Sequence, residues 1–74
     1  MILINQVHLD KFKVFSGSYN YPVSNGVWLT FNKDTLIYEG CYCFFEKRNI
    51  TRVNEEVELA IKKLLARDII YLKD

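Results

Sequence analysis

Two cysteines and a single histidine are the side chains of this sequence best suited to bind a metal ion or to react as nucleophiles. Cys41 and Cys43 are two positions apart, so on a strand both would point to one face, with Cα atoms about 6.6–6.8 Å apart. That separation lies at the outer edge of disulfide geometry. Structural zinc sites usually have four ligands, whereas these thiols and His8 supply only three. We therefore expect no metal and no cofactor, and interpret both cysteines as reduced thiols of a cytoplasmic protein.

Catalysis would require a nucleophile beside a base, paired carboxylates or a metal cluster. His8, Asp10 and Ser24 have the residue types of a triad, but the serine lacks the glycine-flanked motif that holds such a nucleophile in a strained turn. The sequence also lacks a phosphate-binding loop, since Gly17 and Gly26 are nine positions apart and no Gly-Lys-Ser/Thr follows. The sequence therefore predicts a protein that is not an enzyme.

Aromatic residues exceed what a small core needs, because the 74 residues include five tyrosines, five phenylalanines and one tryptophan. Tyr19 and Tyr21 lie among Ser, Gly and Asn, a composition typical of binding loops that offers adaptable contact area at low entropic cost. Aromatic and arginine side chains also dominate many protein interfaces. We therefore predict a surface that binds another protein, formed by Tyr19, Tyr21, Trp28, Phe45, Arg48 and Arg52. The alternative for the two tyrosines is that they simply cover the end of the core.

A second hypothesis is binding of RNA or single-stranded DNA. Lys47, Arg48 and Arg52 cluster just before the expected helix, and a sheet face with Trp28 and Phe45 could stack bases. The charge pattern opposes this hypothesis, because the net charge is only +1 and glutamates at the start of the helix would repel phosphate. The arginines would instead pair with nearby glutamates on the surface. We therefore rank nucleic-acid binding below protein binding.

Short alternating apolar runs predict strands over the first half of the chain. Residues 2–9 and 11–16 are expected to form two strands or one bent strand, with Asp10 at the bend. Residues 16–26 hold the only proline and two of the three glycines, so we expect a long loop that carries both tyrosines. Residues 27–31 and 35–47 are expected to form a hairpin around a polar turn.

The alternation in this hairpin also predicts which side chains face the core. If Phe31 faces Leu36 and Leu29 faces Tyr38, one face is mostly apolar and the other mixes charged and apolar groups. The expected core face contains Val27, Leu29, Phe31, Leu36, Tyr38, Tyr42 and Phe44. The opposite face then contains Trp28, Thr30, Thr35, Ile37, Glu39, Cys41, Cys43, Phe45 and Lys47. Two alternatives would change this assignment: a three-residue turn, or a bulge at Gly40 that resets the alternation.

After residue 50 the apolar residues recur at helical spacing. We expect a helix that begins after Asn54 as its N-cap and ends near Arg67, with acidic residues first and basic residues last, as the helix dipole favours. Its apolar stripe comprises Val53, Val57, Ala60, Ile61, Leu64 and Leu65. Leu59 lies on the opposite side, as an ordinary exposed residue or a contact point. Residues 69–72 are expected to form a last short strand or an extended tail.

Together these patterns predict one α+β domain spanning residues 1–74. It consists of a small antiparallel sheet of three to five strands with one α-helix packed on one face. The elements are expected in the order β-β-β-α, followed by either a short C-terminal strand or an extended tail. An edge strand beginning at Met1 or ending at Leu72 would also allow a homodimer.

The longest apolar run has five residues, 41–45, far below the roughly 20 needed to span a membrane. The first residues also lack the pattern of a secretory signal. We therefore expect a cytoplasmic protein with a protein partner, such as a host complex or a nuclease, and no membrane contact. In size and class alone the chain is similar to small inhibitor, immunity and anti-defence proteins of phages and plasmids, such as anti-CRISPR proteins. That similarity implies an inhibitor that sterically blocks a larger partner.

Overall fold

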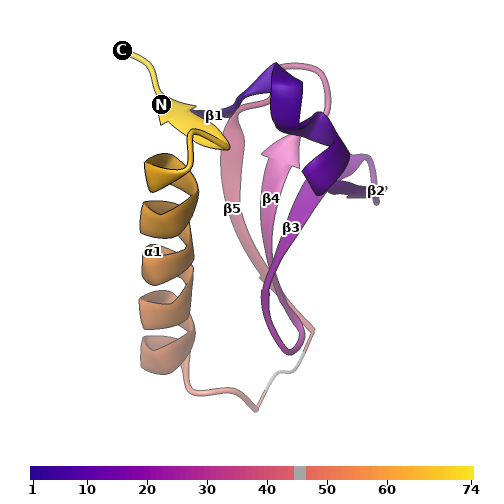
Figure 1. The fold of residues 1–74 in the computed structure, drawn as a ribbon. Helices are drawn as coiled ribbons and strands as arrows, with labels where there is room; N and C mark the ends of the chain where they lie inside the picture. Colours follow the sequence, from indigo (N-terminus) through magenta and orange to yellow (C-terminus); the bar gives the residue numbers. More distant parts are fainter. Residues whose placement is uncertain (45–46) are drawn as a thin grey trace.

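The computed structural model describes residues 1–44 and 47–74 and has the α+β fold that the sequence predicts. One α-helix lies on one side of an antiparallel four-stranded sheet, and a two-stranded sheet joins the two ends of the chain (Figure 1). The elements are β1 (Ile2–Ile4), the 3-10 helix η1 (Gln6–Lys11), β2 (Lys13–Phe15), β3 (Ser18–Ser24), β4 (Val27–Asn32), β5 (Tyr38–Cys43), α1 (Ile50–Ala66) and β6 (Ile70–Leu72).

The larger sheet is a meander in which β2, β3, β4 and β5 pair with their sequence neighbours. In the smaller sheet β1 pairs with β6, with Leu3 opposite Tyr71. A bridge between Leu3 and Ile37, and a bond of 3.0 Å from the Ile4 N–H to the Leu36 carbonyl, place β1 beside the start of β5. The expected C-terminal strand is therefore confirmed. The two strands expected as edges pair with each other, and both chain ends lie at one end of the molecule (Figure 1).

The N-terminal region differs from the expected strands. β1 is a strand, but the residues after it form η1, so Val7 and Leu9 are not strand residues. The cause is Asn5, whose side-chain oxygen accepts a hydrogen bond of 3.3 Å from the Val7 N–H and caps the helix. The Asn5 side-chain amide also donates to the Asp68 carbonyl at 2.9 Å. These side-chain bonds compete with strand pairing, and here they outweigh the alternation.

The prediction that Tyr19 and Tyr21 lie in a long loop is wrong, because both residues belong to strand β3. Residues 16–17 and 25–26 instead make a short turn at each end of this strand. The first pair has positive φ values of 52° and 73°, as in the tight turns that join strands of a hairpin. Pro22 lies beside an irregularity in the pairing of β3 with β4, which is where a strand tolerates a residue without an N–H.

A bulge in β5 sets the register of the β4–β5 hairpin. Phe31 is opposite Tyr38 and Thr30 is opposite Gly40, so Glu39 is an extra residue between two pairs. Gly40 has a φ of 136°, which L side chains rarely adopt, and this explains why the bulge occurs at a glycine. Of the two alternatives that the sequence offers, the bulge at Gly40 is confirmed.

The expected pairs Phe31–Leu36 and Leu29–Tyr38 are wrong, because the turn extends to Leu36, whose N–H donates to the Asn32 carbonyl at 2.8 Å, and Phe31 is opposite Tyr38. The bulge then reverses the faces of the second half of β5. The partners across the two strands are Leu29–Cys41, Trp28–Tyr42 and Val27–Cys43. The core positions expected for Tyr42 and Phe44 are also wrong, because these side chains are 51% and 53% exposed. β5 ends at Cys43 and does not extend to residue 47.

Helix α1 begins earlier than expected and ends where expected. Asn49, not Asn54, is the N-cap, and its side-chain oxygen accepts a bond of 3.2 Å from the Arg52 N–H. The extra first turn places Ile50 on the surface, so the apolar stripe could not reveal it. The helix ends at Ala66. Its buried residues are Val53, Val57 and Leu64.

The hydrophobic core lies between α1 and one face of the larger sheet, which we call the inner face. Successive strand residues point to opposite faces, so the buried Val27, Leu29 and Phe31 of β4 define the inner face. The buried apolar residues are Ile4, Phe12, Val27, Leu29, Phe31, Val53, Val57, Leu64, Ile69 and Ile70. The opposite face, which we call the outer face, carries the alternate residues of each strand.

Candidate functional site

The predicted binding residues fall on different faces of the sheet. Tyr19 is opposite Phe31 and Tyr21 is opposite Leu29, so both tyrosines point to the inner face with these core residues. Trp28 precedes Leu29 in β4 and therefore points to the outer face. The structure does not bring the tyrosines and the tryptophan together on one surface.

Both tyrosines pack against the core while remaining half-buried. The Tyr21 ring lies 5.4 Å from the Phe12 ring, measured between centroids. The tyrosines therefore help to cover the core, as the alternative interpretation of the sequence has it. Tyr21 also lines a groove beside α1.

Four aromatic side chains gather on the outer face. We call this set the aromatic face, and it consists of Phe15, Trp28, Tyr42 and Phe44. Phe15 and Trp28 meet edge to face with ring centroids 5.2 Å apart, and Tyr42 and Phe44 do so at 4.7 Å. Trp28 and Tyr42 are direct partners across β4 and β5, which joins the two pairs. The aromatic face therefore extends from β2 to the end of β5.

One lysine lies over the aromatic face. The Lys13 Nζ is 5.8 Å from the centroid of the Trp28 ring, within the range of a cation–π contact. Lys13 is opposite Asn20, and Asn20 is opposite Thr30, so the lysine belongs to the same outer face. The cation therefore approaches the indole from the β2 side of the sheet.

A hollow of about 320 Å³ lies among these side chains. Its lining residues are Phe15, Ser16, Ser18, Asn20, Thr30, Tyr42 and Phe44. Asn20 is only 3% exposed, and its side-chain amide contacts the carbonyls of Lys13, Phe15 and Ser18 at 3.0–3.2 Å. Because these bonds hold β2 against β3, they fix Phe15 relative to the rest of the aromatic face.

Arg48 is held within the protein by four hydrogen bonds. Its guanidinium donates to both carboxylate oxygens of Glu56 at 2.8 and 2.9 Å, and to the Ser24 Oγ and the Asn25 carbonyl at 3.1 Å. The Ser24 hydroxyl donates to Glu56 at 2.7 Å. Bonds from Ser24 and then Arg48 lower the pKa of Glu56 below its ordinary value of 4.5. This cluster, which we call the Arg48 latch, ties the β3–β4 turn to α1.

Of the two remaining predicted residues, the structure describes one. Arg52 is exposed on the first turns of α1. Phe45 lies outside the described residues. Of the five predicted residues that the structure describes, Trp28 alone lies on the aromatic face.

Sequence reasoning missed the other three residues of the aromatic face. Phe15 lies in the strand expected over residues 11–16 and was assigned to no face, and Tyr42 and Phe44 were expected in the core. The signal that could have found the last two is Gly40, because a one-residue bulge there turns both side chains to the other face.

The reactive side chains do not form a site of their own. Within residues 1–44 and 47–74, no group of three or more His, Cys, Asp or Glu side chains is placed to hold a metal ion. Cys41 and Cys43 are exposed thiols. Ser24 bonds to Arg48 and Glu56. Burial, and then the nearby Cys41, raise the pKa of Tyr38, whose ring packs 5.4 Å from that of Phe31.

Neither helix of the described ranges is long and apolar enough to cross a membrane. No family model, curated protein or solved structure matches this chain, so its function is inferred from the geometry of its surfaces.

Proposed function

We propose that this protein is a cytoplasmic, non-enzymatic binding module that attaches to a larger protein through the aromatic face and sterically blocks part of its surface. The observation that supports this proposal is the cluster of four aromatic side chains on the outer face, two of them about half-exposed. Contiguous exposed apolar patches mark interaction sites in soluble proteins, because a partner removes apolar area from water.

Tyr42 and Phe44 would be the anchors of this interface. An aromatic side chain can bury about 150–250 Å², so a half-exposed ring leaves roughly 100 Å² for a partner to cover, worth about 2.5 kcal/mol at 25 cal/mol per Å². That value lies in the range of interface hot spots. Phe15 and Trp28 are more buried and would form the flatter part of the contact surface.

The low charge of the outer face favours a protein partner. The described residues that line the hollow carry no charged side chain, and Lys13 already lies over Trp28. The centres of protein interfaces are depleted in charged residues and enriched in aromatic residues. Polar side chains of the hollow, such as Ser18 and Thr30, would provide hydrogen-bonding groups within the same surface.

Site-specific photo-cross-linking would test the proposal. Benzoylphenylalanine in place of Tyr42 should cross-link a partner in the source cells, whereas the same probe in place of Val7, which is 76% exposed on η1, should not. With the captured partner purified, Tyr42→Ser and Phe44→Ser should each raise its Kd about tenfold or more in calorimetry.

Val7→Ser is the control, because it removes an apolar side chain that is even more exposed, on another surface. It should leave the Kd unchanged. Full partner affinity in the Tyr42→Ser, Phe44→Ser double variant would exclude the aromatic face as the binding surface. If position 42 cross-links only to a second copy of the chain, the aromatic face serves a homodimer and the blocking function is wrong.

Single-stranded nucleic acid is the second candidate, because the open sheet face presents aromatic rings together with Lys13, as sheets that stack bases do. Against it, phosphate binding depends on several cations, and the net charge of the chain is +1. Fluorescence anisotropy with a labelled oligonucleotide at low salt decides between the two. Tight binding that Tyr42→Ser removes would favour this second candidate over a protein partner.

A further inference from the structure

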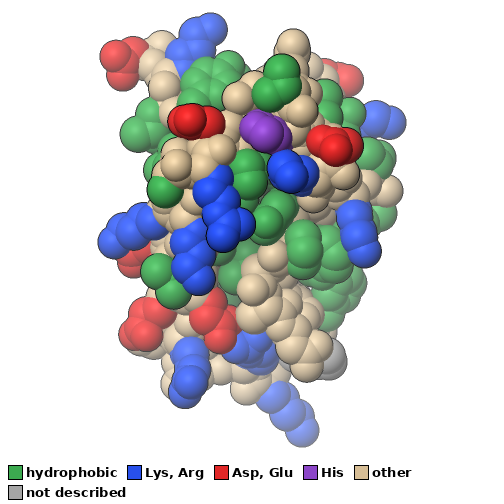
Figure 2. Space-filling view, in the orientation of Figure 1, with side chains coloured by type: hydrophobic (Ala, Val, Ile, Leu, Met, Phe, Trp, Pro, Cys, Tyr) green, Lys and Arg blue, Asp and Glu red, His purple; other side chains and the backbone are tan. Residues whose placement is uncertain are grey.

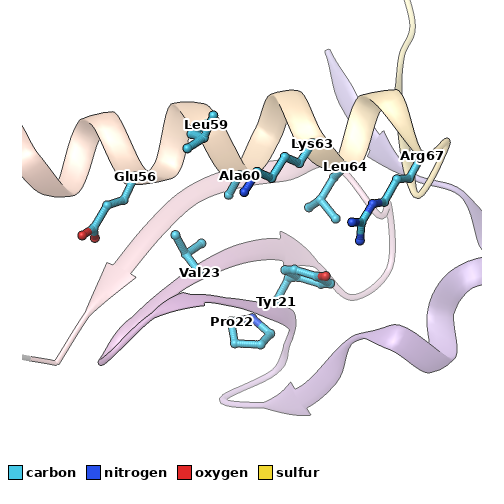
Figure 3. Close-up of a pocket in the computed structure, with 9 residues that line it drawn as sticks. All are labelled: Tyr21, Pro22, Val23, Glu56, Leu59, Ala60, Lys63, Leu64 and Arg67. Carbon is cyan, nitrogen blue, oxygen red and sulfur yellow. The ribbon is translucent and has the colours of Figure 1, made fainter.

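A groove with a volume of about 220 Å³ lies between β3 and α1, on the side of the sheet opposite the aromatic face. Figure 3 shows side chains of β3 on one wall and side chains of the helix on the other. The lining residues are Tyr21, Pro22, Val23, Glu56, Leu59, Ala60, Lys63, Leu64 and Arg67. The groove therefore follows the helix for about three turns.

The walls in the middle of the groove are apolar, and the Lys63 side chain runs beside them toward Ala60 (Figure 3). Val23, Ala60 and Leu64 line the middle, and Leu59, which is 55% exposed, borders it on the helix side (Figure 3). Leu59 is therefore part of a concave surface and is not isolated among polar residues. The volume is below the 300–1,000 Å³ or so of sites for drug-sized ligands and suits one large apolar side chain.

The two ends of the groove differ in charge. Lys63 and Arg67 are exposed one helical turn apart near the C-terminal end of α1, where the Arg67 side chain extends toward Tyr21 (Figure 3). Lysine and arginine side chains also gather over this half of the helix in the space-filling view (Figure 2). At the other end, Glu56 is engaged by Arg48 and Ser24. The groove therefore offers cationic donors along its C-terminal half, from the Lys63 side chain, which extends back toward Ala60, to Arg67 (Figure 3).

The length of the groove suits a short extended peptide. Glu56 and Arg67 are eleven positions apart, which corresponds to about 16 Å along the helix axis. An extended chain covers that length with about five residues. A peptide with an apolar last residue would place its side chain on Val23, Ala60 and Leu64 and its terminal carboxylate between Lys63 and Arg67.

We propose that this groove binds the C-terminal residues of a partner polypeptide, with a free α-carboxylate at Lys63 and Arg67 and an apolar last side chain in the apolar middle of the groove. The inference deepens the proposed function and rests on the partner being a protein. It adds a second contact surface, separate from the aromatic face, that recognises the charge and the shape of a chain end.

Backbone amide NMR with a defined probe tests this inference. The probe is the pentapeptide Gly-Ser-Gly-Ser-Leu, added to about 5 mM to detect millimolar affinity. The free acid should shift the amides of Val23, Ala60 and Leu64 in a saturable way. The same peptide with an amidated C-terminus should bind about tenfold more weakly, because it lacks the charge-assisted hydrogen bonds.

Neighbouring lysines on one helix provide the control. Lys63→Gln and Arg67→Gln should each weaken binding of the acid by about tenfold, whereas Lys62→Gln, an exposed residue that does not line the groove, should leave it unchanged. The same spectra report whether each variant is folded.

Three outcomes would overturn the inference. They are equal binding of acid and amide, no saturable shift in the groove, or tighter binding of octanoate than of the peptide at the same residues, which would make the groove a site for small apolar acids. None of these outcomes affects the proposed function, whose test depends on Tyr42 and Phe44. Conversely, a failed cross-link at Tyr42 with normal peptide binding would remove the proposed function and leave the groove as a peptide site.

Discussion

Gly40→Ala tests the feature on which the aromatic face depends, namely the bulge in β5. Gly40 has a φ of 136°, a backbone conformation that residues with a Cβ rarely adopt. A Cβ built at this position meets nothing within 4 Å. The cost of the substitution therefore comes from the backbone conformation alone, with no steric clash to confuse its interpretation.

The expected destabilisation is about 1–3 kcal/mol, the cost of holding a non-glycine residue in a sparsely populated region of φ and ψ. For a domain of this size each kcal/mol shifts the midpoint of thermal unfolding by about 4–8 °C. A central value of about 2 kcal/mol therefore corresponds to a decrease of about 8–16 °C.

Thermal unfolding followed by circular dichroism measures this shift, and Glu39→Ala is the control. Glu39 is the extra residue of the same bulge, but its side chain is exposed and its φ is not positive, so its substitution should change the free energy of unfolding by less than about 0.5 kcal/mol. Identical midpoints for Gly40→Ala and Glu39→Ala would refute the reasoning. The positive φ at Gly40 would then not be what holds the bulge on which the aromatic face depends.

Three further predictions concern the parts that support this face and the groove. The pKa of Glu56 is lowered in the folded protein, so the ionised carboxylate stabilises the fold fully above pH 4.5, and this stabilisation is lost as the pH falls through the folded-state pKa. Between about pH 6 and pH 2, the free energy of unfolding should therefore decrease less steeply for Glu56→Gln than for the unsubstituted protein. Asn20→Ala should lower the free energy of unfolding by about 1–3 kcal/mol, since it removes a buried donor from three carbonyls, and a neutral result in denaturant unfolding would contradict this. Ile70→Ala should lower the free energy of unfolding by about 2–5 kcal/mol, because Ile70 is fully buried. Leu72→Ala in the same strand should change it by less than about 0.5 kcal/mol, because Leu72 is 68% exposed. Equal effects of the two substitutions would show that β6 does not pack against the core.

The elements with strong periodic signals could be predicted from the sequence. The helical spacing from Val53 to Leu65 marked α1, and its end near Arg67 agrees with the structure to within one residue. The start was wrong because the first turn adds Ile50, a surface residue, and because Asn49 and Asn54 are equally good N-caps by residue type. Periodicity thus predicted the buried part of the helix and not its exposed extension.

The errors in the first half of the chain arise from local polar interactions that override patterns of alternation. The Asn5 side chain caps η1 and bonds to Asp68, which lies 63 positions away in the chain. That partner could not be inferred from neighbouring residues. Likewise, turn-forming residues at 16–17 and 25–26 suggested one loop, although two short turns can bound a strand that contains a proline.

The candidate site was harder to predict than the fold, because its composition depends on which face of the sheet each residue of β5 points to. A single extra residue at the bulge exchanges the faces of every later residue in β5, so Tyr42 and Phe44 replace Cys41 and Cys43 on the outer face. The register could not be decided between a regular hairpin and a bulge, since both bury apolar residues. The pairing of Trp28 with Tyr42, the exposure of Tyr42 and Phe44 and the positive φ at Gly40 distinguish them in the structure.

The aromatic face and the groove lie on opposite sides of β3, which limits how one partner can use both. Tyr21 lines the groove beside α1 on the inner face, whereas the following strand presents Trp28 to the outer face, so a rigid partner surface cannot cover both at once. A folded body on the aromatic face could still reach the groove with a flexible C-terminal tail that passes around an edge of the sheet. In that case the two contacts would be linked through an effective concentration, and substitutions at Tyr42 and Lys63 would weaken binding of the intact partner in a coupled way. If different molecules occupy the two surfaces, the same substitutions would act independently, each on its own ligand.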